Sequence, residues 1–274
     1  MRLLELFSGT GSIGRAFVDK GWDVISVDLD AKANATITAN MMTWDYKIHE
    51  PGYFDCVWAS PPCTHYSIAR TTAITPRDLD GSDKLVARVL EIIAYHKPSS
   101  FFLENPQSGL MKTRAVVEGL EFVDTSYCKY SFAYRKNTRF WTDCKYFKPR
   151  PMCCKSSPCE MQATLNHHES TAQRGPGKLQ SKLKTNDRQS LNQLYSMTET
   201  LCDEIAFAAK LSQVAANVLP DQVLKWPLLK QWIVSNQTKQ QIIFVVAVSL
   251  LCLSYLNFLS LLPQFYSSFS CTYD

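Results

Sequence analysis

Residues 3–12 decide the fold: they read Leu-Leu-Glu-Leu-Phe-Ser-Gly-Thr-Gly-Ser, in which the short apolar run 3–7 enters a glycine-rich turn. The amphipathic segment 13–20 follows directly, and together they predict a buried strand, a tight turn and a helix. The same alternation of apolar runs and helical patterns continues at 23–27, 54–59, 84–96 and 100–103. Strands that alternate with helices predict an α/β fold with a parallel sheet that is covered on both faces.

The composition is that of a globular chain with one large core. Its 274 residues are 46% hydrophobic and 20% charged, which excludes a disordered or collagen-like chain and leaves room for one main domain with a small module. Residues 129–190 hold 13 of the 29 basic and only 4 of the 25 acidic side chains, so this segment carries the positive excess. A basic segment beside a mildly acidic domain favours contact with nucleic acid, and a solvated surface is the alternative.

Two later segments complete the organisation. Residues 143–189 are rich in Lys, Arg, Pro, Cys and His and have little periodicity, which predicts a small irregular module. Helical spacing returns over 191–217, where an apolar stripe would face the core. The residues of this stripe are Leu194, Leu201, Ile205, Ala208 and Leu211.

Glycines and an acid follow the first two apolar runs. Ligands of an open parallel sheet bind beyond the carboxyl ends of its strands, so residues at these positions are informative. Gly9 and Gly11 let the backbone turn tightly and approach a ligand closely. Asp28 can accept hydrogen bonds from both hydroxyls of a ribose. The combination favours a nucleoside-containing cofactor, and a plain connection between strand and helix is the alternative.

The next two apolar runs bring a thiol and a carboxyl group to the same edge. Pro61 and Pro62 stiffen the loop that carries Cys63, and Glu104 ends the following run. A cysteine and a glutamate at one edge favour a nucleophile and a proton donor, provided that burial keeps Glu104 protonated near neutral pH. The alternatives are a buried structural cysteine and an exposed acid at a strand end.

These residues occur in the order and spacing of a known family. The motifs are Phe7-x-Gly9-x-Gly11, Asp28, Pro61-Pro62-Cys63, Glu104-Asn105 and Tyr134-Arg135-Lys136-Asn137-Thr138-Arg139. Over roughly residues 1–210 the chain resembles the DNA cytosine-5 methyltransferases, and their compact phage- and virus-type members in particular. The resemblance implies a Rossmann-like S-adenosylmethionine-dependent fold, with a catalytic domain at 1–142, a recognition module at 143–189 and a helix at 190–219 that returns to the catalytic domain.

The resemblance also implies a mechanism. Cys63 would add as a thiolate to C6 of cytosine, and C5 of the resulting enamine would attack the methyl group of S-adenosylmethionine. Glu104 would contact N3 and the amino group of the base, and Arg139 would help to fix the base and the catalytic loop. The target cytosine would be flipped out of DNA, because neither face of C6 is accessible inside a duplex.

Seven residues would bind the cofactor according to this resemblance. Phe7 would lie against its adenine or methionine portion, the two glycines under its carboxylate, and Asp28 on its ribose. Where the family has an adenine-binding Asp, the chain offers Asn40, with Asp45 shortly after it. The full set is Phe7, Gly9, Gly11, Asp28, Asn40, Asp45 and Pro62.

Two departures from the family's pattern concern the base and the DNA. The usual Gln-x-Arg-x-Arg motif is here Arg135-Lys136-Asn137-Thr138-Arg139, so only the last arginine carries over. The large target-recognition domain of restriction-type members is missing, which predicts a short or relaxed recognition sequence. Whether a restriction enzyme accompanies this chain is left open.

The irregular module contains soft metal ligands. Cys144, Cys153, Cys159 and His168 are the set that the resemblance to compact members favours, and four such ligands would close a tetrahedral zinc site. Their spacing matches no standard zinc ribbon or knuckle, so free thiols and surface histidines are the alternative. The surrounding lysines and arginines would contact DNA phosphates.

The cysteine content and the C-terminal tail bear on the location of the protein. Ten cysteines without a signal peptide predict a reducing intracellular compartment, the cytoplasm or nucleus of a host. The tail 220–274 contains the uncharged segment 242–262, which is long enough to cross a bilayer. A membrane anchor, a helix packed on the domain and a non-native extension of the reading frame are the interpretations left open.

Two other functions compete with DNA methylation. The altered arginine motif and Asn40 would also suit a catalytically silent nucleic-acid-binding protein on a methyltransferase fold, although Gly9, Gly11, Cys63 and Glu104 argue against it. An RNA cytosine-5 methyltransferase would use the same chemistry on a different substrate.

Overall fold

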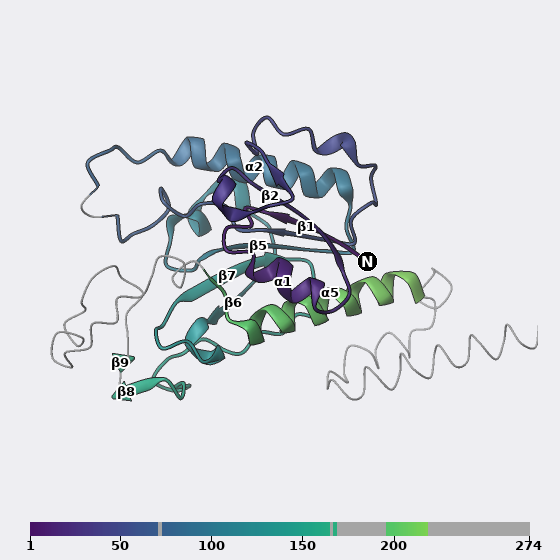
Figure 1. The fold of residues 1–274 in the computed structure, drawn as a ribbon. Helices are drawn as coiled ribbons and strands as arrows, with labels where there is room; N and C mark the ends of the chain where they lie inside the picture. Colours follow the sequence, from purple (N-terminus) through teal and green to yellow (C-terminus); the bar gives the residue numbers. More distant parts are fainter. Residues whose placement is uncertain (71–72, 165–166, 169–195, 219–274) are drawn as a thin grey trace, which may run out of the picture. The chain divides into compact units, whose positions relative to one another are not determined.

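The structure, a computed structural model, describes residues 1–70, 73–164, 167–168 and 196–218 (Figure 1). The chain forms two compact units, Met1–Ala216 and Asn217–Asp274, and nearly all of the described residues belong to the first. The predicted apolar segment 242–262 lies outside the described residues, as does Leu194 of the predicted stripe. Among the helices that are described, none is long and apolar enough to cross a membrane.

A seven-stranded sheet lies at the centre of the first unit, in the order β3-β2-β1-β4-β5-β7-β6. Its strands are β1 (Arg2–Leu6), β2 (Asp23–Asp28), β3 (Ile37–Thr38), β4 (Cys56–Ala59), β5 (Ser100–Pro106), β6 (Phe122–Ser126) and β7 (Asn137–Thr142). The first five strands in this order are parallel, whereas β7 is antiparallel to both β5 and β6. The predicted α/β fold with a parallel sheet is confirmed, and the reversed edge is an addition that was not predicted.

Local side-chain caps explain where the helices begin. Helix α1 (Ser12–Val18) follows the glycine-rich turn as predicted. Helix α2 (Leu79–His96) starts before the predicted segment 84–96, because the carboxylate of its N-cap Asp78 accepts a hydrogen bond from the Gly81 N–H at 2.7 Å.

Helix α5 (Glu199–Val218) begins later than the predicted start at residue 191. Thr198 provides the cap, since its hydroxyl accepts from the Leu201 N–H at 3.2 Å. The predicted stripe is confirmed for Leu201, Ile205 and Ala208, which are buried, while Leu211 is half-buried.

Several short elements connect the strands and helices. They are the 3-10 turns η1 (Ala31–Ala33), η2 (Tyr46–Ile48), η3 (Leu110–Thr113), η4 (Ala115–Val117) and η5 (Tyr127–Tyr130), and the hairpin of β8 (Gln162–Thr164) and β9 (His167–His168).

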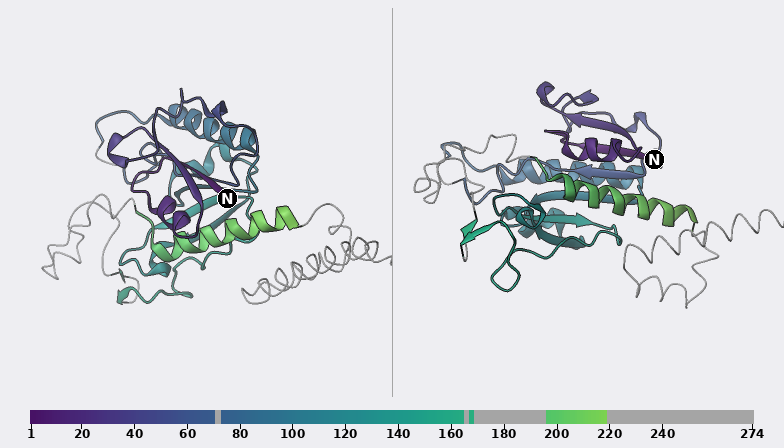
Figure 2. Two further views of the ribbon diagram at one scale, coloured as in Figure 1. Left: turned by 45° about the vertical axis from the view of Figure 1, so that its right-hand side comes forward. Right: turned by 60° about the horizontal axis from the view of Figure 1, so that its bottom comes forward.

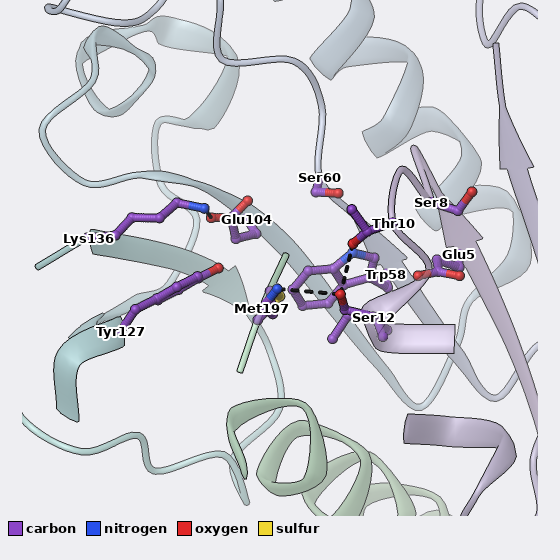
Figure 3. A pocket seen from close by; sticks show the side chains of 11 residues that line it. Glu5, Ser8, Thr10, Ser12, Trp58, Ser60, Glu104, Tyr127, Lys136 and Met197 are labelled. Carbon is purple, nitrogen blue, oxygen red and sulfur yellow. Dashed lines mark hydrogen bonds and ion pairs between the residues drawn. The ribbon is translucent and has the colours of Figure 1, made fainter. Parts of the chain in front are cut away.

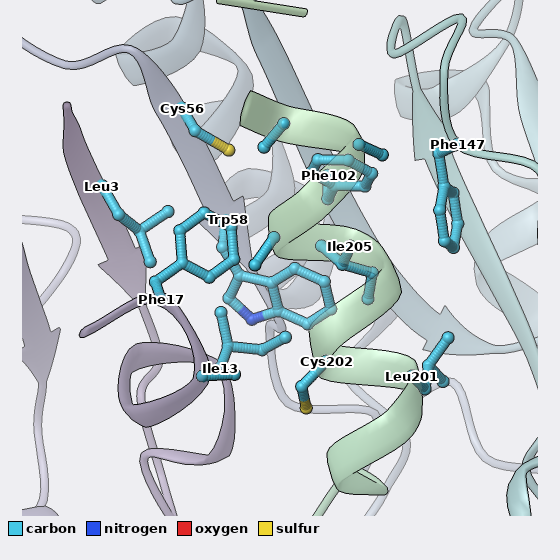
Figure 4. Packing of buried hydrophobic residues seen from close by; sticks show 14 of the residues in the cluster. Leu3, Ile13, Phe17, Cys56, Trp58, Phe102, Phe147, Leu201, Cys202 and Ile205 are labelled. Atoms are coloured by element: carbon cyan, nitrogen blue, oxygen red, sulfur yellow. The ribbon is translucent and has the colours of Figure 1, made fainter. Parts of the chain in front are cut away.

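The sheet separates two apolar cores. Trp58, Phe102 and Phe140 project towards α1 and α5, which run side by side on one face (Figures 2 and 4). Leu103 and Trp141 project towards α2 on the opposite face. Successive side chains of a strand point to opposite faces. The face of each polar residue of β5 and β7 therefore follows from the face of the apolar residue next to it in the strand.

Candidate active site

The loop after β1 is shaped by positive backbone angles. Phe7, Gly9 and Gly11 have φ angles of 59°, 50° and 65°, and Phe7 is the unusual one because a side chain disfavours this region. The Phe7 N–H donates to the Val27 carbonyl at 2.8 Å, which fixes the loop against β2. This arrangement holds a bent backbone at the carboxyl edge of the sheet, where a ligand can approach it closely.

Asp28 ends β2 beside that loop. One carboxylate oxygen accepts from the Gly9 N–H at 2.8 Å, and the other accepts from the Asp30 N–H at 2.9 Å. The side chain is therefore fixed in orientation and remains half-buried at the edge. The structure thus brings together Phe7, Gly9, Gly11 and Asp28 from the predicted cofactor set.

The two candidates for the adenine position occupy different places. Asn40 lies immediately beyond β3, and the N–H of its neighbour Ala39 donates to the Asp28 carbonyl at 2.9 Å. Asp45 instead caps η2 by accepting from the Lys47 N–H at 3.1 Å. Asn40 therefore shares the edge with Asp28 and Asp45 lies further along the chain, although each side chain also accepts from a backbone N–H two residues on, Met42 at 2.9 Å for Asn40 and Lys47 for Asp45.

The loop that carries Cys63 is anchored from both sides. The Ser60 hydroxyl donates to the Phe7 carbonyl at 3.1 Å, which joins this loop to the cofactor loop. On the other side, the Asn105 amide donates to the Pro61 carbonyl at 3.0 Å in a buried contact. Pro62 directly follows these anchors and is exposed, and Cys63 is half-buried, so the thiol lies at the sheet edge close to a fixed part of the backbone.

Glu104 on β5 is only 8% exposed, as its predicted role requires. Burial raises the pKa of its carboxyl group, and the nearby Lys136 charge opposes that shift. Burial also raises the pKa of the Cys63 thiol, with a further increase from the charge of Glu104 and a decrease from Lys136. The three groups are thus close enough to influence one another.

Lys136 is a site residue that the sequence analysis did not predict. Its Nζ lies 3.9 Å from Oε1 of Glu104 and 4.5 Å from the ring centre of Tyr127. These three side chains form one wall of a pocket whose opposite wall includes Thr10 and Ser12 of the cofactor loop (Figure 3). The pocket therefore connects the loop after β1 to Glu104.

Arg139 does not reach this pocket. It lies between two residues that face α1 and α5, so its own side chain points to the α2 face of the sheet. There its guanidinium forms a bidentate ion pair with Asp124 at 2.7 and 2.8 Å and covers the Phe122 ring at 3.5 Å. The structure brings Cys63 and Glu104 together and directs Arg139 elsewhere, because the direction of a strand residue depends on its position along β7.

Several buried polar atoms around the pocket have no hydrogen-bond partner among the described residues. Within the described residues, the Ser8 and Thr138 hydroxyls, the Tyr127 hydroxyl and Oε1 of Glu104 make no hydrogen bond of acceptable geometry. Unpartnered buried polar groups are costly, and a polar ligand between them would remove that cost. The pocket is therefore suited to a polar ligand that offers donors and acceptors.

Four soft ligands cluster beside this region, but the predicted set is wrong at one position. Cys153, Cys159 and His168 come together as predicted, and Cys128 of η5 completes the group, with all four ligand atoms within 4.8 Å of one another. Cys144 is instead buried in the core that packs on α1 and α5. No motif marks Cys128 in the sequence, since it lies far from the other three ligands along the chain.

The sheet order and the polar carboxyl edge define a Rossmann-like methyltransferase fold. The family of C-5 cytosine-specific DNA methylases matches residues 1–122. A probable DNA (cytosine-5)-methyltransferase of Frog virus 3 (isolate Goorha) is 39% identical over 175 residues, which represent 59% of this chain and 79% of that protein. The chain belongs to this family and is, by class, an S-adenosylmethionine-dependent DNA cytosine-5 methyltransferase.

Solved structures with similar folds are more distant. A putative DNA modification methyltransferase of an E. coli prophage has 17% identity and a TM-score of 0.41, over 56% of this chain and 52% of that one. The S. pombe Dnmt2 methyltransferase has 18% identity and a TM-score of 0.39, over 56% of this chain and 53% of that one. The Entamoeba histolytica methyltransferase EhMeth has 14% identity and a TM-score of 0.49, over 76% of this chain and 97% of that one. The chain thus spans about half the length of the first two.

Proposed function

We propose that this protein transfers a methyl group from S-adenosylmethionine to C5 of cytosine in DNA through a covalent bond between Cys63 and C6. The observation that carries the proposal is the arrangement of three groups: an anchored thiol, a buried acid with a raised pKa, and a lysine beside that acid. Each group suits one requirement of addition to a pyrimidine ring.

Cys63 supplies the nucleophile. Its thiolate adds to C6, and the electrons of the C5–C6 double bond move into the ring, towards C5, N3 and O2. Protonated Glu104 donates a hydrogen bond to N3 and stabilises the charge that develops there. S-adenosylmethionine, when bound, supplies an electrophilic methyl group to C5. A base then removes the C5 proton, and the returning electrons expel the Cys63 thiolate.

Lys136 takes the place that the sequence analysis gave to Arg139 as the cation of the base pocket. Its ammonium group shares the pocket with Glu104 and Tyr127, so it lies where negative charge develops on the ring. It also favours the thiolate form of Cys63 by lowering the thiol pKa. Because a pocket of this kind cannot be reached by a base inside a duplex, the target cytosine is flipped out of the DNA.

The cofactor is held at the opposite side of the pocket. The bent backbone of Phe7, Gly9 and Gly11 accommodates its methionine portion, and Asp28, fixed by two backbone N–H groups, accepts from its ribose. Asn40 takes the adenine position in preference to Asp45. The exposed Pro62 borders the cofactor from the catalytic loop.

A structural zinc ion is the second cofactor in this proposal. Cys128, Cys153, Cys159 and His168 offer three thiols and one imidazole without any carboxylate, which is the donor set of a closed zinc site. Basic side chains of the adjoining segment contact phosphates, so binding to DNA weakens steeply with salt.

Covalent trapping tests the catalytic proposal. The full chain is incubated with S-adenosylmethionine and a DNA duplex that contains 5-fluorocytosine, whose fluorine does not leave as a proton does. We expect a protein–DNA adduct that resists denaturation, is lost in Cys63→Ala and persists in the control Cys154→Ala, which replaces an exposed thiol.

Each alternative function has its own outcome in this experiment. An adduct with 5-fluorocytosine in structured RNA but none with DNA would make RNA the substrate. Cofactor binding without an adduct on either nucleic acid would contradict the Cys63 mechanism. Nucleic-acid binding without cofactor binding would identify the silent DNA-binding protein.

A further inference from the structure

The metal-ligand cluster lies at a junction between two parts of the chain. Cys128 comes from η5, directly after β6, whereas Cys153, Cys159 and His168 come from the segment that ends in the β8–β9 hairpin. Cys128 and Cys153 are 2% and 3% exposed, and His168 is 9% exposed. A closed site of this kind is typical of a structural metal, because no position is open to a substrate.

The distances within the cluster fit a tetrahedral zinc ion. With ordinary zinc–sulfur and zinc–nitrogen bonds, the sulfur and nitrogen ligands of such an ion lie about 3.6 Å apart. The Nε2 atom of His168 lies 3.6 Å from Sγ of Cys153 and 3.2 Å from Sγ of Cys159. Small adjustments would therefore be enough to bind the ion.

The same segment also holds η5 along most of its length. The Cys153 N–H donates to the Ser126 hydroxyl at 3.0 Å, just before η5 begins. Lys129 Nζ donates to the Pro158 carbonyl at 2.8 Å. Arg150 then secures the end of the turn, because its N–H donates to the Tyr130 hydroxyl at 2.8 Å.

Tyr127 is the residue of η5 that reaches the base pocket. Its side chain is fully buried and lies with Glu104 and Lys136 in the pocket wall (Figure 3). Its N–H donates to the Lys136 carbonyl at 3.0 Å, and its ring lies 4.5 Å from the Lys136 ammonium. Tyr127 thus connects the metal ligand Cys128, its direct neighbour in the chain, to Lys136.

We infer that zinc bound by Cys128, Cys153, Cys159 and His168 positions Tyr127 and Lys136 in the base pocket, so that capture of the cytosine depends on the metal. The inference rests on the proposed zinc site and goes beyond it. The four ligands are positioning residues, because none of them reaches the pocket. A single 3-10 turn has little stability of its own, and a displacement of about 1 Å in a catalytic wall reduces rates by about 100-fold.

The cofactor edge does not share this dependence. Phe7, Gly9 and Asp28 are held by β2 and by the loop after β4, and within the part of the chain that the structure describes their hydrogen bonds involve no residue of the metal-binding segment. Loss of the metal should therefore impair base capture and spare cofactor binding.

The test compares Cys128→Ser with Cys154→Ser in the full-length protein. Cys154 is a matched control because it lies in the same segment, is exposed and is not part of the cluster. Zinc is measured as the number of ions per chain by mass spectrometry. We expect one ion in the wild type and in Cys154→Ser, and none in Cys128→Ser.

Two further measurements distinguish positioning from general loss of structure. In Cys128→Ser we expect kcat/KM for DNA to fall at least tenfold, while the Kd for S-adenosylmethionine stays within twofold. Hydrogen exchange should become faster in peptides that cover 127–142 and stay unchanged in peptides that cover 1–30. If Cys128→Ser does not fold, His168→Cys, which keeps four soft ligands, should retain zinc and activity, whereas His168→Ala should lose both.

The possible failures are separable. A zinc-free Cys128→Ser protein with wild-type exchange over 127–142 and unchanged kcat/KM would overturn the inference but leave methyl transfer intact. A wild-type protein that binds no zinc would overturn both the metal site and the inference. If the wild type binds zinc but methylates nothing, methyl transfer fails, and the exchange measurement alone decides whether the metal positions η5.

Discussion

The cofactor edge and the base pocket are built in different ways. Asp28 ends β2, and Gly9 and Cys63 lie in the loops after β1 and β4, where the carboxyl ends of the parallel strands all meet at one edge. Lys136 and Tyr127 instead come from the reversed part of the sheet, where neighbouring strands run in opposite directions. In a parallel sheet, the residues just after each strand meet at one edge, so short sequence motifs are enough to identify the site. At an antiparallel edge, the pairing of the strands and the face to which each side chain points decide which residues reach the site.

The largest expected effect comes from the one residue on which both regions converge. Replacing Cys63 with Ser should lower methyl transfer to DNA at least 1,000-fold, because a hydroxyl is a far weaker nucleophile than a thiolate at neutral pH. Cofactor binding, measured by calorimetry, should change less than twofold. Near-normal turnover in this variant would mean that the base pocket works without a covalent adduct.

A second prediction concerns the stability of the cofactor edge. Glu5 is 2% exposed and accepts from the Gly14 N–H at 3.0 Å, and burial raises its pKa to about 7. Its folded-state pKa is raised, so its contribution is fully present below pH 4.5 and is lost as pH rises through about 7. The loss should be on the order of 3 kcal/mol in the free energy of unfolding.

Urea unfolding at pH 5 and pH 8 measures this contribution. In Glu5→Gln the free energy of unfolding should decrease less between pH 5 and pH 8 than in the wild type. The control Glu118→Gln, which replaces an exposed residue, should show the same decrease as the wild type. An equal decrease in wild type and Glu5→Gln would show that Glu5 is ionised in the folded protein throughout.

Lys136, which directly precedes β7, and Arg139, which lies within it, provide the sharpest comparison. Lys136→Gln should lower kcat/KM for DNA about 10- to 100-fold, because the pocket loses its cation. Lys136 lowers the pKa of both Cys63 and Glu104, so its removal raises both. The rising and falling limbs of the pH–rate profile should therefore move to higher pH.

Arg139→Gln is the matched control for Lys136. This substitution removes the ion pair with Asp124 on the α2 face and leaves that largely buried carboxylate without its cation, which should reduce stability by about 3 kcal/mol and leave the pH–rate profile in place. A shifted profile in Arg139→Gln together with an unshifted one in Lys136→Gln would mean that the faces of β7 are reversed in the working enzyme.

The smallest expected effect tests the cofactor edge alone. Asp28→Asn should weaken binding of S-adenosylmethionine about tenfold, since the amide keeps only one of the two oxygens that accept from the Gly9 and Asp30 N–H groups and its hydrogen bonds are no longer charge-assisted. The value of kcat at saturating cofactor should remain unchanged. Asp45→Asn is the control, because that carboxylate caps η2, and an equal loss of affinity there would make Asp45 the adenine ligand instead of Asn40.

What could be predicted from the sequence differs between the parallel part of the sheet and the rest of the site. The apolar runs and the residues after them were enough to place Cys63 and Glu104 at one edge. Three residues of the predicted metal set come together in the structure, whereas the fourth, Cys144, lies in the core and Cys128 takes its place in the cluster. Periodicity cannot distinguish a buried structural thiol from a ligand thiol, because both are apolar in pattern and differ only in what surrounds them after folding.

By itself, the sequence determined the class of this protein, the parallel character of its main sheet and the glycine-rich turn after the first strand, because each is recorded in short local patterns of the chain. Tertiary structure decided that Lys136 enters the base pocket, that Arg139 turns to the opposite face and that Cys128 completes the metal cluster. These outcomes depend on strand direction and on pairing between distant segments. A shift of one position along a strand moves a side chain to the opposite face of the sheet, and the local sequence pattern does not show which face is used.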